Sequence, residues 1–310
     1  MKFQVVVLLL LFSVMLSAQK VFNVRYPSST KQISIHPGLH IPTISSGYTL
    51  WLPKGAKTNG MIVFLYENRD TLQQDLLLKT AMSNGIAVIF MTTDNPLEFL
   101  FEESKTKMLA QDLDRVCTNF SIPKKNLLFA GHSIAGIRAM KLAIYLKQNK
   151  IFEPIIPKAI AISDVPLDIS RFYGKCEKEF SQELGDYEWA GSFSAMQYLS
   201  NHLDGNPSNS KARYASYSPY SRTVRNGGNA GYFLDLYIRA YVDENTDWTS
   251  IQHGGNAYDM ANFINQLRLL GSDKAILVQS KLPRNTKSSW DLVDERNLVE
   301  WFARLCVQKE

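Results

Sequence analysis

The stretch Leu127–Gly136 constrains the fold more than any other part of this chain, because a strand runs into a helix there almost without a turn. Leu127–Ala130 are all apolar, and so short a run fits a strand that is buried on both faces. A helical pattern starts soon after Gly131–Ser133, and the connection leaves room for a turn of only one or two residues. The residue at such a turn is expected to have a strained backbone. The apolar stripe of the helix comprises Ile137, Met140 and Ile144.

Ser133 occupies the predicted turn, and its surroundings are typical of a catalytic serine. Strand and helix approach closely only if the residues two before and two after the turn are small, and these are Gly131 and Ala135. A serine held there projects its hydroxyl above the sheet, while the backbone amide of Ile134 points toward a developing oxyanion. The pattern indicates a nucleophile elbow, with alanine in place of the commoner second glycine. The alternative is an ordinary loop in which the serine caps the helix.

The start of the chain has the pattern of a secretory signal peptide. Lys2 precedes an almost wholly apolar run over Val5–Leu16, and small residues follow up to Ala18. The run is shorter than the ~20 residues of a membrane-spanning helix, although an uncleaved anchor is the alternative. We therefore expect residues 1–18 to be removed and 19–310 to form a secreted or periplasmic protein without stable membrane insertion.

Charge and cysteine content exclude several classes of function. The net charge is +5 and no run of Lys and Arg forms a basic patch, so we expect no nucleic-acid partner. The three cysteines, Cys117, Cys176 and Cys306, cannot all pair within one chain. Their spacing matches neither a metal site nor a disulfide framework. We accordingly expect no metal and no cofactor.

The rest of the chain alternates strand and helix patterns, which predicts an α/β protein with a mainly parallel, doubly wound sheet. One stretch interrupts the alternation: about 166–222 is far longer than a plain loop of up to ~15 residues and is rich in aromatic residues. We expect this insertion to form a small helical cap, the alternative being a surface excursion without a role in binding. Besides the strand before Ser133, strands are expected at 48–53, 61–66, 86–91, 158–163, 234–242 and 275–279.

With its elbow, element order, insertion and final strand–helix pair, the chain resembles proteins of the α/β-hydrolase fold over nearly all of Val21–Glu310. It is similar to the secreted bacterial esterase-like and peptidase-like members. The resemblance implies acyl transfer by a serine nucleophile, a histidine base and an orienting carboxylate, in the chain order serine, acid, histidine. The implied substrates are a small-molecule ester, a peptide or a glycan-derived compound.

The resemblance also suggests which residues accompany Ser133. The carboxylate is expected after the strand that ends near 242, where Asp247 is the first choice and Asp243 the second. Asp164 is a third, less favoured candidate for this carboxylate. Each of the three side chains also fits a turn or a helix cap. The second oxyanion donor is expected in the loop after 61–66. Family members commonly have His-Gly there, whereas this chain offers the backbone amide of Glu67.

The histidine is the departure from the family pattern. The loop Ser280–Trp290, where the resemblance places the base, contains lysine and arginine but no histidine. His253, expected in the loop after Asp247, is the candidate base, and His202 in the cap is the next. One interpretation is a serine hydrolase with an atypical base. The other is a catalytically degenerate hydrolase fold that acts as a ligand-binding module. The chain has five histidines: His36, His40, His132, His202 and His253.

Overall fold

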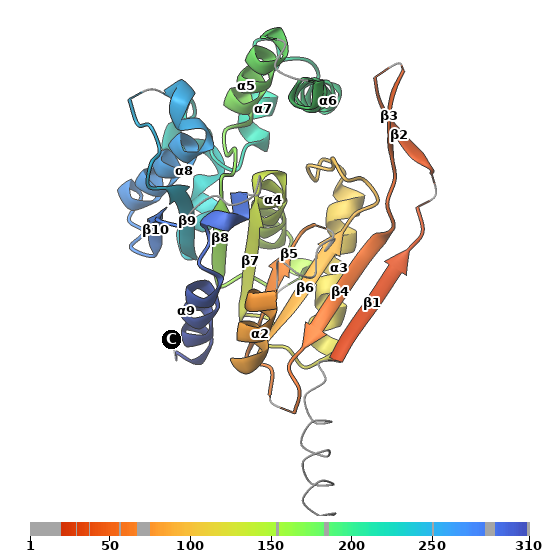
Figure 1. The fold of residues 1–310 in the computed structure, drawn as a ribbon, viewed down its shortest axis with the longest axis vertical. Helices are drawn as coiled ribbons and strands as arrows, with labels where there is room; N and C mark the ends of the chain where they lie inside the picture. Colours follow the sequence, from red (N-terminus) through yellow and green to blue (C-terminus); the bar gives the residue numbers. More distant parts are fainter. Residues whose placement is uncertain are drawn as a thin grey trace, which may run out of the picture.

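The computed structural model describes residues 20–28, 30–36, 38–55, 57–66, 75–152, 155–182, 186–249, 251–282 and 289–308. At the centre lies an eight-stranded sheet with the order β1-β4-β6-β5-β7-β8-β9-β10 (Figure 1). The six neighbouring strands β6, β5, β7, β8, β9 and β10 pair in parallel. Strand β4 pairs antiparallel with both β1 and β6. The prediction of a mainly parallel sheet is therefore confirmed. The strands are β1 (Lys20–Tyr26), β4 (Ser46–Leu52), β5 (Gly60–Phe64), β6 (Ile86–Thr92), β7 (Leu127–His132), β8 (Ala159–Ser163), β9 (Tyr237–Asp243) and β10 (Ala275–Ser280).

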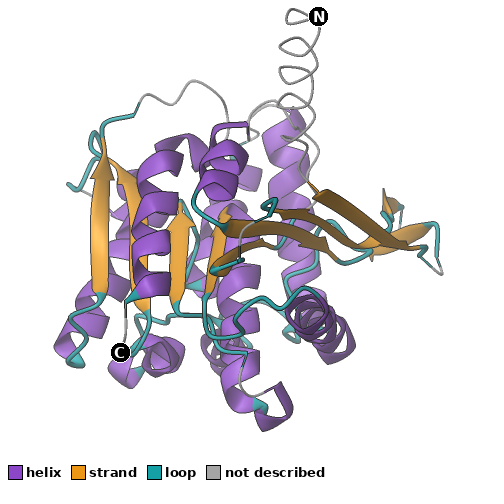
Figure 2. Ribbon diagram, turned by 90° about the horizontal axis from the view of Figure 1, so that it is seen from below, coloured by secondary structure: helices purple, strands orange, loops and turns teal. Residues whose placement is uncertain are grey.

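Helices cover both faces of this sheet, as the apolar character of the central strands predicted (Figure 2). One face packs against α3, α4 and α8, and the other packs against α2 and α9. Because alternate residues of each strand point to opposite faces, the protein has two hydrophobic clusters separated by the sheet. These helices are α2 (Asp75–Ser83), α3 (Glu103–Asn119), α4 (Ser133–Gln148), α8 (Ile251–Leu269) and α9 (Glu295–Val307).

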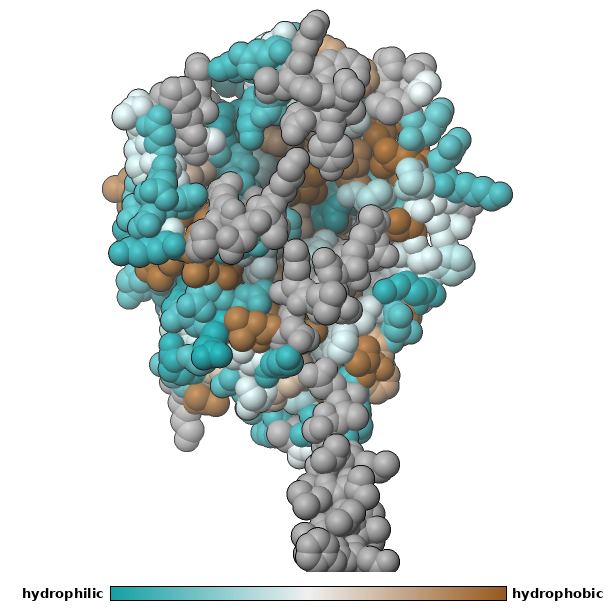
Figure 3. All heavy atoms as spheres, in the orientation of Figure 1, coloured by the Kyte–Doolittle hydropathy of each residue, from teal (hydrophilic) through white to brown (hydrophobic). Residues whose placement is uncertain are grey.

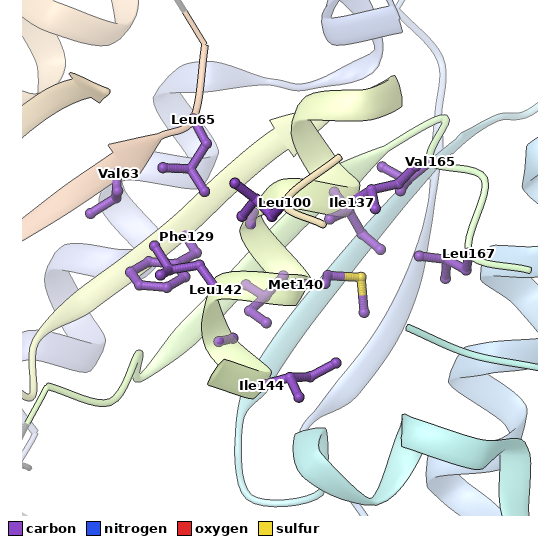
Figure 4. Packing of buried hydrophobic residues seen from close by; sticks show 14 of the residues in the cluster. Val63, Leu65, Leu100, Phe129, Ile137, Met140, Leu142, Ile144, Val165 and Leu167 are labelled. Atoms are coloured by element: carbon purple, nitrogen blue, oxygen red, sulfur yellow. The ribbon is translucent and has the colours of Figure 1, made fainter. Parts of the chain in front are cut away.

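The larger cluster fixes α4 against the middle of the sheet (Figure 4). Ile137, Met140 and Ile144, the stripe predicted from the sequence, are all buried in it. Figure 4 shows them with Phe129 of β7 and with Val165, which follows β8. The helix that begins at Ser133 is consequently held along its whole length.

The insertion between β8 and β9 is helical, as expected. It contains α5 (Ile169–Ser181), α6 (Asp186–His202) and α7 (Lys211–Tyr217), and the 3₁₀ segment η3 (Arg225–Phe233) follows. Five of its described tyrosines pack inside the larger hydrophobic cluster, which accounts for much of the aromatic composition of the stretch. That the insertion roofs the site stays a prediction. The buried tyrosines are Tyr173, Tyr198, Tyr214, Tyr217 and Tyr220.

Two features of the fold differ from the sequence prediction. Strand β9 begins at Tyr237 rather than at Leu234, because Leu234 directly follows η3 and belongs to a turn. Strand β1 and the hairpin of β2 (Gln32–His36) and β3 (Leu39–Pro42) were not predicted from the sequence. Strand β1 is largely exposed, so its residues lack the apolar alternation that marks a half-buried strand.

All three cysteines are free, and each lies in a helix. Cys117 and Cys176 are buried, while Cys306 packs at the edge of the smaller cluster. Burial raises the pKa of each thiol to about 12, so these cysteines behave as small apolar groups.

The surface is mixed in character. On the face shown in Figure 3, apolar residues form small separate patches among polar ones. Such scattered exposure is ordinary for a folded protein. Within the described part of the chain, no helix has the length and hydropathy required to span a membrane. The expected signal peptide, residues 1–18, lies outside the described residues.

Candidate active site

Ser133 stands at the junction of β7 and α4, and it has the strained backbone that the sequence predicted. Its φ is +47°, in the left-handed region that residues with a side chain rarely adopt. Such strain persists only where the surrounding structure enforces it, and it is common at active sites. The side chain is half-buried at the start of the helix. Its catalytic assignment stays a prediction.

The neighbours of Ser133 show why small residues are needed at this junction. A Cβ atom added to Gly131 would lie 2.7 Å from the backbone carbon of Ala135, closer than real Cβ contacts allow. At Gly136 an added Cβ would lie 2.1 Å from Cγ2 of Val165. The elbow is therefore packed against its own helix and against the segment that follows β8.

Sheet register places three strand ends side by side next to this serine. His132 of β7 is in register with Ser163 of β8, which is in register with Tyr241 of β9. Asp164 directly follows Ser163 and also has a left-handed φ, of +51°. It is therefore level with Ser133 on the adjacent strand. The end of β9, where the preferred acids lie, is two strands away, at about 10 Å.

The two preferred carboxylates organise the turn after β9. Oδ1 of Asp243 accepts hydrogen bonds from the backbone N and Nδ2 of Asn245, at 2.9 and 3.2 Å. Oδ1 of Asp247 accepts from the backbone N and Oγ1 of Thr249, at 2.8 and 2.6 Å. Both residues therefore make the local turn contacts that the sequence analysis weighed as the alternative. Neither bond excludes a triad function, because a carboxylate has further acceptor sites.

His132 lies on the opposite face of the sheet from α4. Its ring centroid is 5.8 Å from that of Tyr66 and 6.4 Å from that of Trp290. Burial lowers the pKa of this imidazole, and the charges of Asp164 and Asp291 oppose the shift only in part. His132 is accordingly neutral near pH 7, and its ring packs beside Tyr66 and Trp290.

His202, the second candidate base, belongs to an aromatic cluster that joins the insertion to Phe101, which precedes α3. Its Nδ1 lies 2.8 Å from the carbonyl oxygen of Tyr198, one turn earlier in α6. The ring stacks on Phe101, with 4.7 Å between centroids and 14° between planes. Because a carbonyl only accepts, Nδ1 carries the proton, and Nε2 is the nitrogen left to act as a base.

His253 is placed differently from the expectation. The predicted loop is shorter, because α8 begins at Ile251, and His253 lies in a first helical turn that a kink at Gly255 separates from the rest of the helix. Its side chain lies outside the described residues. The glycines that follow it hid the helical pattern, and Gly255 has the left-handed φ of +54°.

The described residues next to His253 connect α8 to the elbow region and to the insertion. Nδ2 of Asn256 donates to the carbonyl oxygen of Asp164 at 3.1 Å. Arg171 of α5 donates to both carboxylate oxygens of Asp259, from Nε at 2.6 Å and from a terminal nitrogen at 2.7 Å. The start of α8 is thereby held against the residue that is level with Ser133. No local sequence pattern predicts this link.

The end of β5 is held by a residue that the sequence patterns did not single out. The guanidinium of Arg138, fully inside the protein, donates to the carbonyl oxygens of Leu65 at 3.0 Å, Pro96 at 2.6 Å and Glu98 at 2.5 Å. Burial lowers the pKa of Arg138 to about 10, so it remains charged at neutral pH. Glu67, the expected oxyanion donor in the loop after β5, lies outside the described residues. The available signal was an arginine in the first half of a mostly apolar helix.

The loop after β10 supplies no imidazole, as its sequence requires. Lys281 is exposed, and residues 283–288 lie outside the described part. Trp290 at its far end donates from Nε1 to Glu295 at 3.0 Å, which fixes η4 (Ser289–Leu292) to α9. Among the described residues, no three His, Cys, Asp or Glu side chains form a group that could hold a metal ion.

Comparison with known proteins supports the architecture. No family model matches the chain, and no curated protein is significantly similar to it in sequence. Solved structures do match. Carboxyl esterase 2 of Tuber melanosporum is 14% identical with a TM-score of 0.56, and the match covers 93% of this chain and 87% of that one.

Two further structures match to a similar degree. MPT51 of Mycobacterium tuberculosis is 15% identical with a TM-score of 0.56, over 93% of this chain and 98% of that one. The thermophilic carboxylesterase EstE1, from a metagenomic library, is 12% identical with a TM-score of 0.56, over 96% and 94%. At such identities the likeness concerns the fold alone. Together with the sheet order and the strained serine turn, it shows that this chain has the α/β-hydrolase fold.

Proposed function

We propose that the protein is a secreted or periplasmic serine hydrolase that cleaves small carboxylic esters through Ser133. The observation that carries the proposal is the left-handed φ of Ser133 between a buried strand and helix, next to two glycines that leave no room for a side chain. A strained serine at this point of the sheet suits a nucleophile. The similarity to solved esterases supports esters as the substrate class.

In the proposed reaction, Oγ of Ser133 bonds to the carbonyl carbon of the ester while its proton passes to a base. The resulting oxyanion accepts a hydrogen bond from the backbone N–H of Ile134 at the start of α4. The alcohol leaves with the proton from the base, and water then hydrolyses the acyl-enzyme by the same steps in reverse. Glu67 is the proposed second amide donor.

We assign the base to His253, with Asp247 or Asp243 as its carboxylate partner. The hydrogen bond of Asn256 to Asp164 supports this assignment, because it holds α8, directly after the kink at Gly255, beside the strand end that is level with Ser133. His202 is the alternative, with Nε2 as the accepting nitrogen.

Labelling with an active-site fluorophosphonate tests the proposal. The parent protein should be labelled at Ser133, and Ser133→Ala should abolish labelling. His253→Ala should reduce the rate by about 10²–10⁴-fold, the usual contribution of a general base. The exposed His40→Ala is the matched control and should label at the parent rate.

Each outcome separates the hypotheses. If His253→Ala labels like the parent while His202→Ala is slow, the base is His202. A folded parent protein that neither takes up the label nor hydrolyses p-nitrophenyl acetate would contradict the hydrolase assignment and favour the ligand-binding module.

A further inference from the structure

A cavity of about 290 Å³ lies beside α4 at a distance from the elbow. This volume is close to the lower end of the ≈300–1,000 Å³ that small-molecule sites occupy. Lys141, which lines the cavity, follows Ser133 by eight residues, or about 12 Å along the helix. Neither Ser133 nor its neighbours line it, so the cavity is separate from the proposed ester site. Its apolar wall includes Leu100, Phe101 and Ile144, and its polar wall includes Glu103, Lys141 and Gln148.

Lys141 has an unusual environment for a lysine. Its Nζ donates a hydrogen bond to the backbone carbonyl oxygen of Tyr217 at 3.1 Å. The same Nζ lies 4.2 Å from the centroid of the Tyr217 ring. It makes no ion pair with any carboxylate of the described residues, whereas Lys147 on the same helix pairs with Asp235. The amine is thus tethered in place without a counter-charge.

Burial lowers the pKa of Lys141 to about 8. At pH 7 the unprotonated fraction of its amine is therefore on the order of 10² greater than that of an ordinary lysine. The titratable groups around it are Glu103 of α3, Tyr145 of α4 and Tyr217 of α7. Burial also raises the pKa of both tyrosines, which leaves them neutral. At pH 7 the amine of Lys141 is still mostly protonated, but its enlarged unprotonated fraction is a nucleophile on the wall of a cavity.

We propose that Lys141 and this cavity form a second site, which takes a small neutral aldehyde and holds it as an imine. The amine nitrogen bonds to the carbonyl carbon, and the carbonyl oxygen leaves as water with the two amine protons. Side chains such as Glu103 and Tyr145 supply groups for the proton transfers of this dehydration.

The composition of the cavity wall selects the ligand class. Glu103 disfavours a carboxylate-bearing keto acid, because the bound ligand would place a second negative charge near it. The three apolar residues suit a hydrocarbon or aromatic body, and Gln148 offers a hydrogen bond to a polar end. A neutral aromatic aldehyde of one ring satisfies these conditions.

Reductive trapping on the full chain tests this site. The protein is incubated with 4-hydroxybenzaldehyde and sodium cyanoborohydride between pH 6 and 9, and alkylated lysines are quantified by peptide mass spectrometry. Lys141 should react at least about tenfold faster than Lys147, at a rate that saturates with aldehyde concentration. Its rate should rise with pH to about 8 and then level off. The variant Lys141→Arg should lose this fast label, whereas Lys147→Arg should keep it.

The controls distinguish a binding site from a merely reactive amine. 4-Carboxybenzaldehyde carries a negative charge that Glu103 disfavours, so its reaction with Lys141 should be slow and should not saturate. Equal rates at Lys141 and Lys147, a rate linear in 4-hydroxybenzaldehyde, or equally fast labelling by 4-carboxybenzaldehyde would overturn the proposal. None of these measurements depends on Ser133, so they stand apart from the test of ester hydrolysis.

Discussion

The elbow at Ser133 depends on two glycines whose missing Cβ atoms leave room for close backbone packing. Ser133 tolerates a left-handed backbone because Gly131 lets α4 approach the strand and Gly136 lets it approach Val165. Both approaches are closer than a methyl group allows. Next to them, His132 is held neutral in an aromatic pocket by Tyr66 and Trp290.

Gly136→Ala should destabilise the fold by about 1–3 kcal/mol, the usual cost of overpacking. The added methyl group meets Val165, which as a β-branched residue cannot easily move aside. In the double variant with Val165→Ala, the loss should be smaller than the sum of the two single losses. Gly174→Ala is the matched control, since nothing lies within 4 Å of its added Cβ in α5, and it should stabilise by about 0.5–1 kcal/mol. Urea unfolding measures all four variants.

The buried His132 should make stability depend on pH. Its pKa is lowered in the folded state from the ordinary 6.5, so the unfolded chain takes up the proton first. This contribution to stability is complete above pH 6.5 and is lost as the pH falls through the lowered value. His132→Gln should therefore show a smaller decrease in unfolding free energy between pH 7 and 5 than the parent. An identical decrease in both would contradict the assignment, and the exposed His40→Gln is the control.

At the scale of elements, one buried charge joins four parts of the molecule. Arg138 of α4 holds the end of β5 through Leu65 and the segment after β6 through Pro96 and Glu98. The carboxylate of Glu98 accepts in turn from the hydroxyl of Tyr198 in α6, at 3.2 Å. The elbow helix, two loops and the insertion are thereby held in one arrangement.

Arg138→Met should cost about 3 kcal/mol or more, because each buried carbonyl group left without its donor costs about 1–3 kcal/mol. The variant leaves three such carbonyl groups, and it removes a buried positive charge near Glu98, whose carboxylate keeps its ion pair with Lys105 at 3.7 Å. Adding Glu98→Gln should recover part of the loss. Arg213→Ala is the comparison, because Arg213 pairs with Asp204 at the surface and should cost about 1 kcal/mol or less. A loss in Arg138→Met no greater than in Arg213→Ala, measured by urea unfolding, would refute the prediction.

At the scale of the whole molecule, the sheet separates two hydrophobic cores, and β1 is the strand at one of its ends. Strand β1 starts at Lys20, two residues after Ala18, where cleavage is expected, and it pairs with β4 along its full length. No described strand pairs with the other side of β1, which makes it an edge strand of this sheet.

Export should remove residues 1–18, since the charged start, apolar run and small residues match a signal peptide. Intact-mass measurement on protein recovered from the periplasm or the medium should give the mass of 19–310. A mass that retains the first eighteen residues would contradict the proposed localisation. Protein expressed directly as 19–310 is the control, and it should fold with the same unfolding free energy because β1 is complete in it.

Local patterns in the sequence determined the elbow, most strands of the sheet and the helical insertion. Each depends on residues a few positions apart, such as the four apolar residues before Gly131 or the stripe at Ile137 and Met140. Only the tertiary structure decided what lies beside them. The pairing of β1 and the three carbonyl partners of Arg138 join residues far apart in the chain. Asn256, likewise, meets Asp164 only because β8 ends beside α8. Such contacts depend on how strands and helices pack, and no local periodicity encodes them.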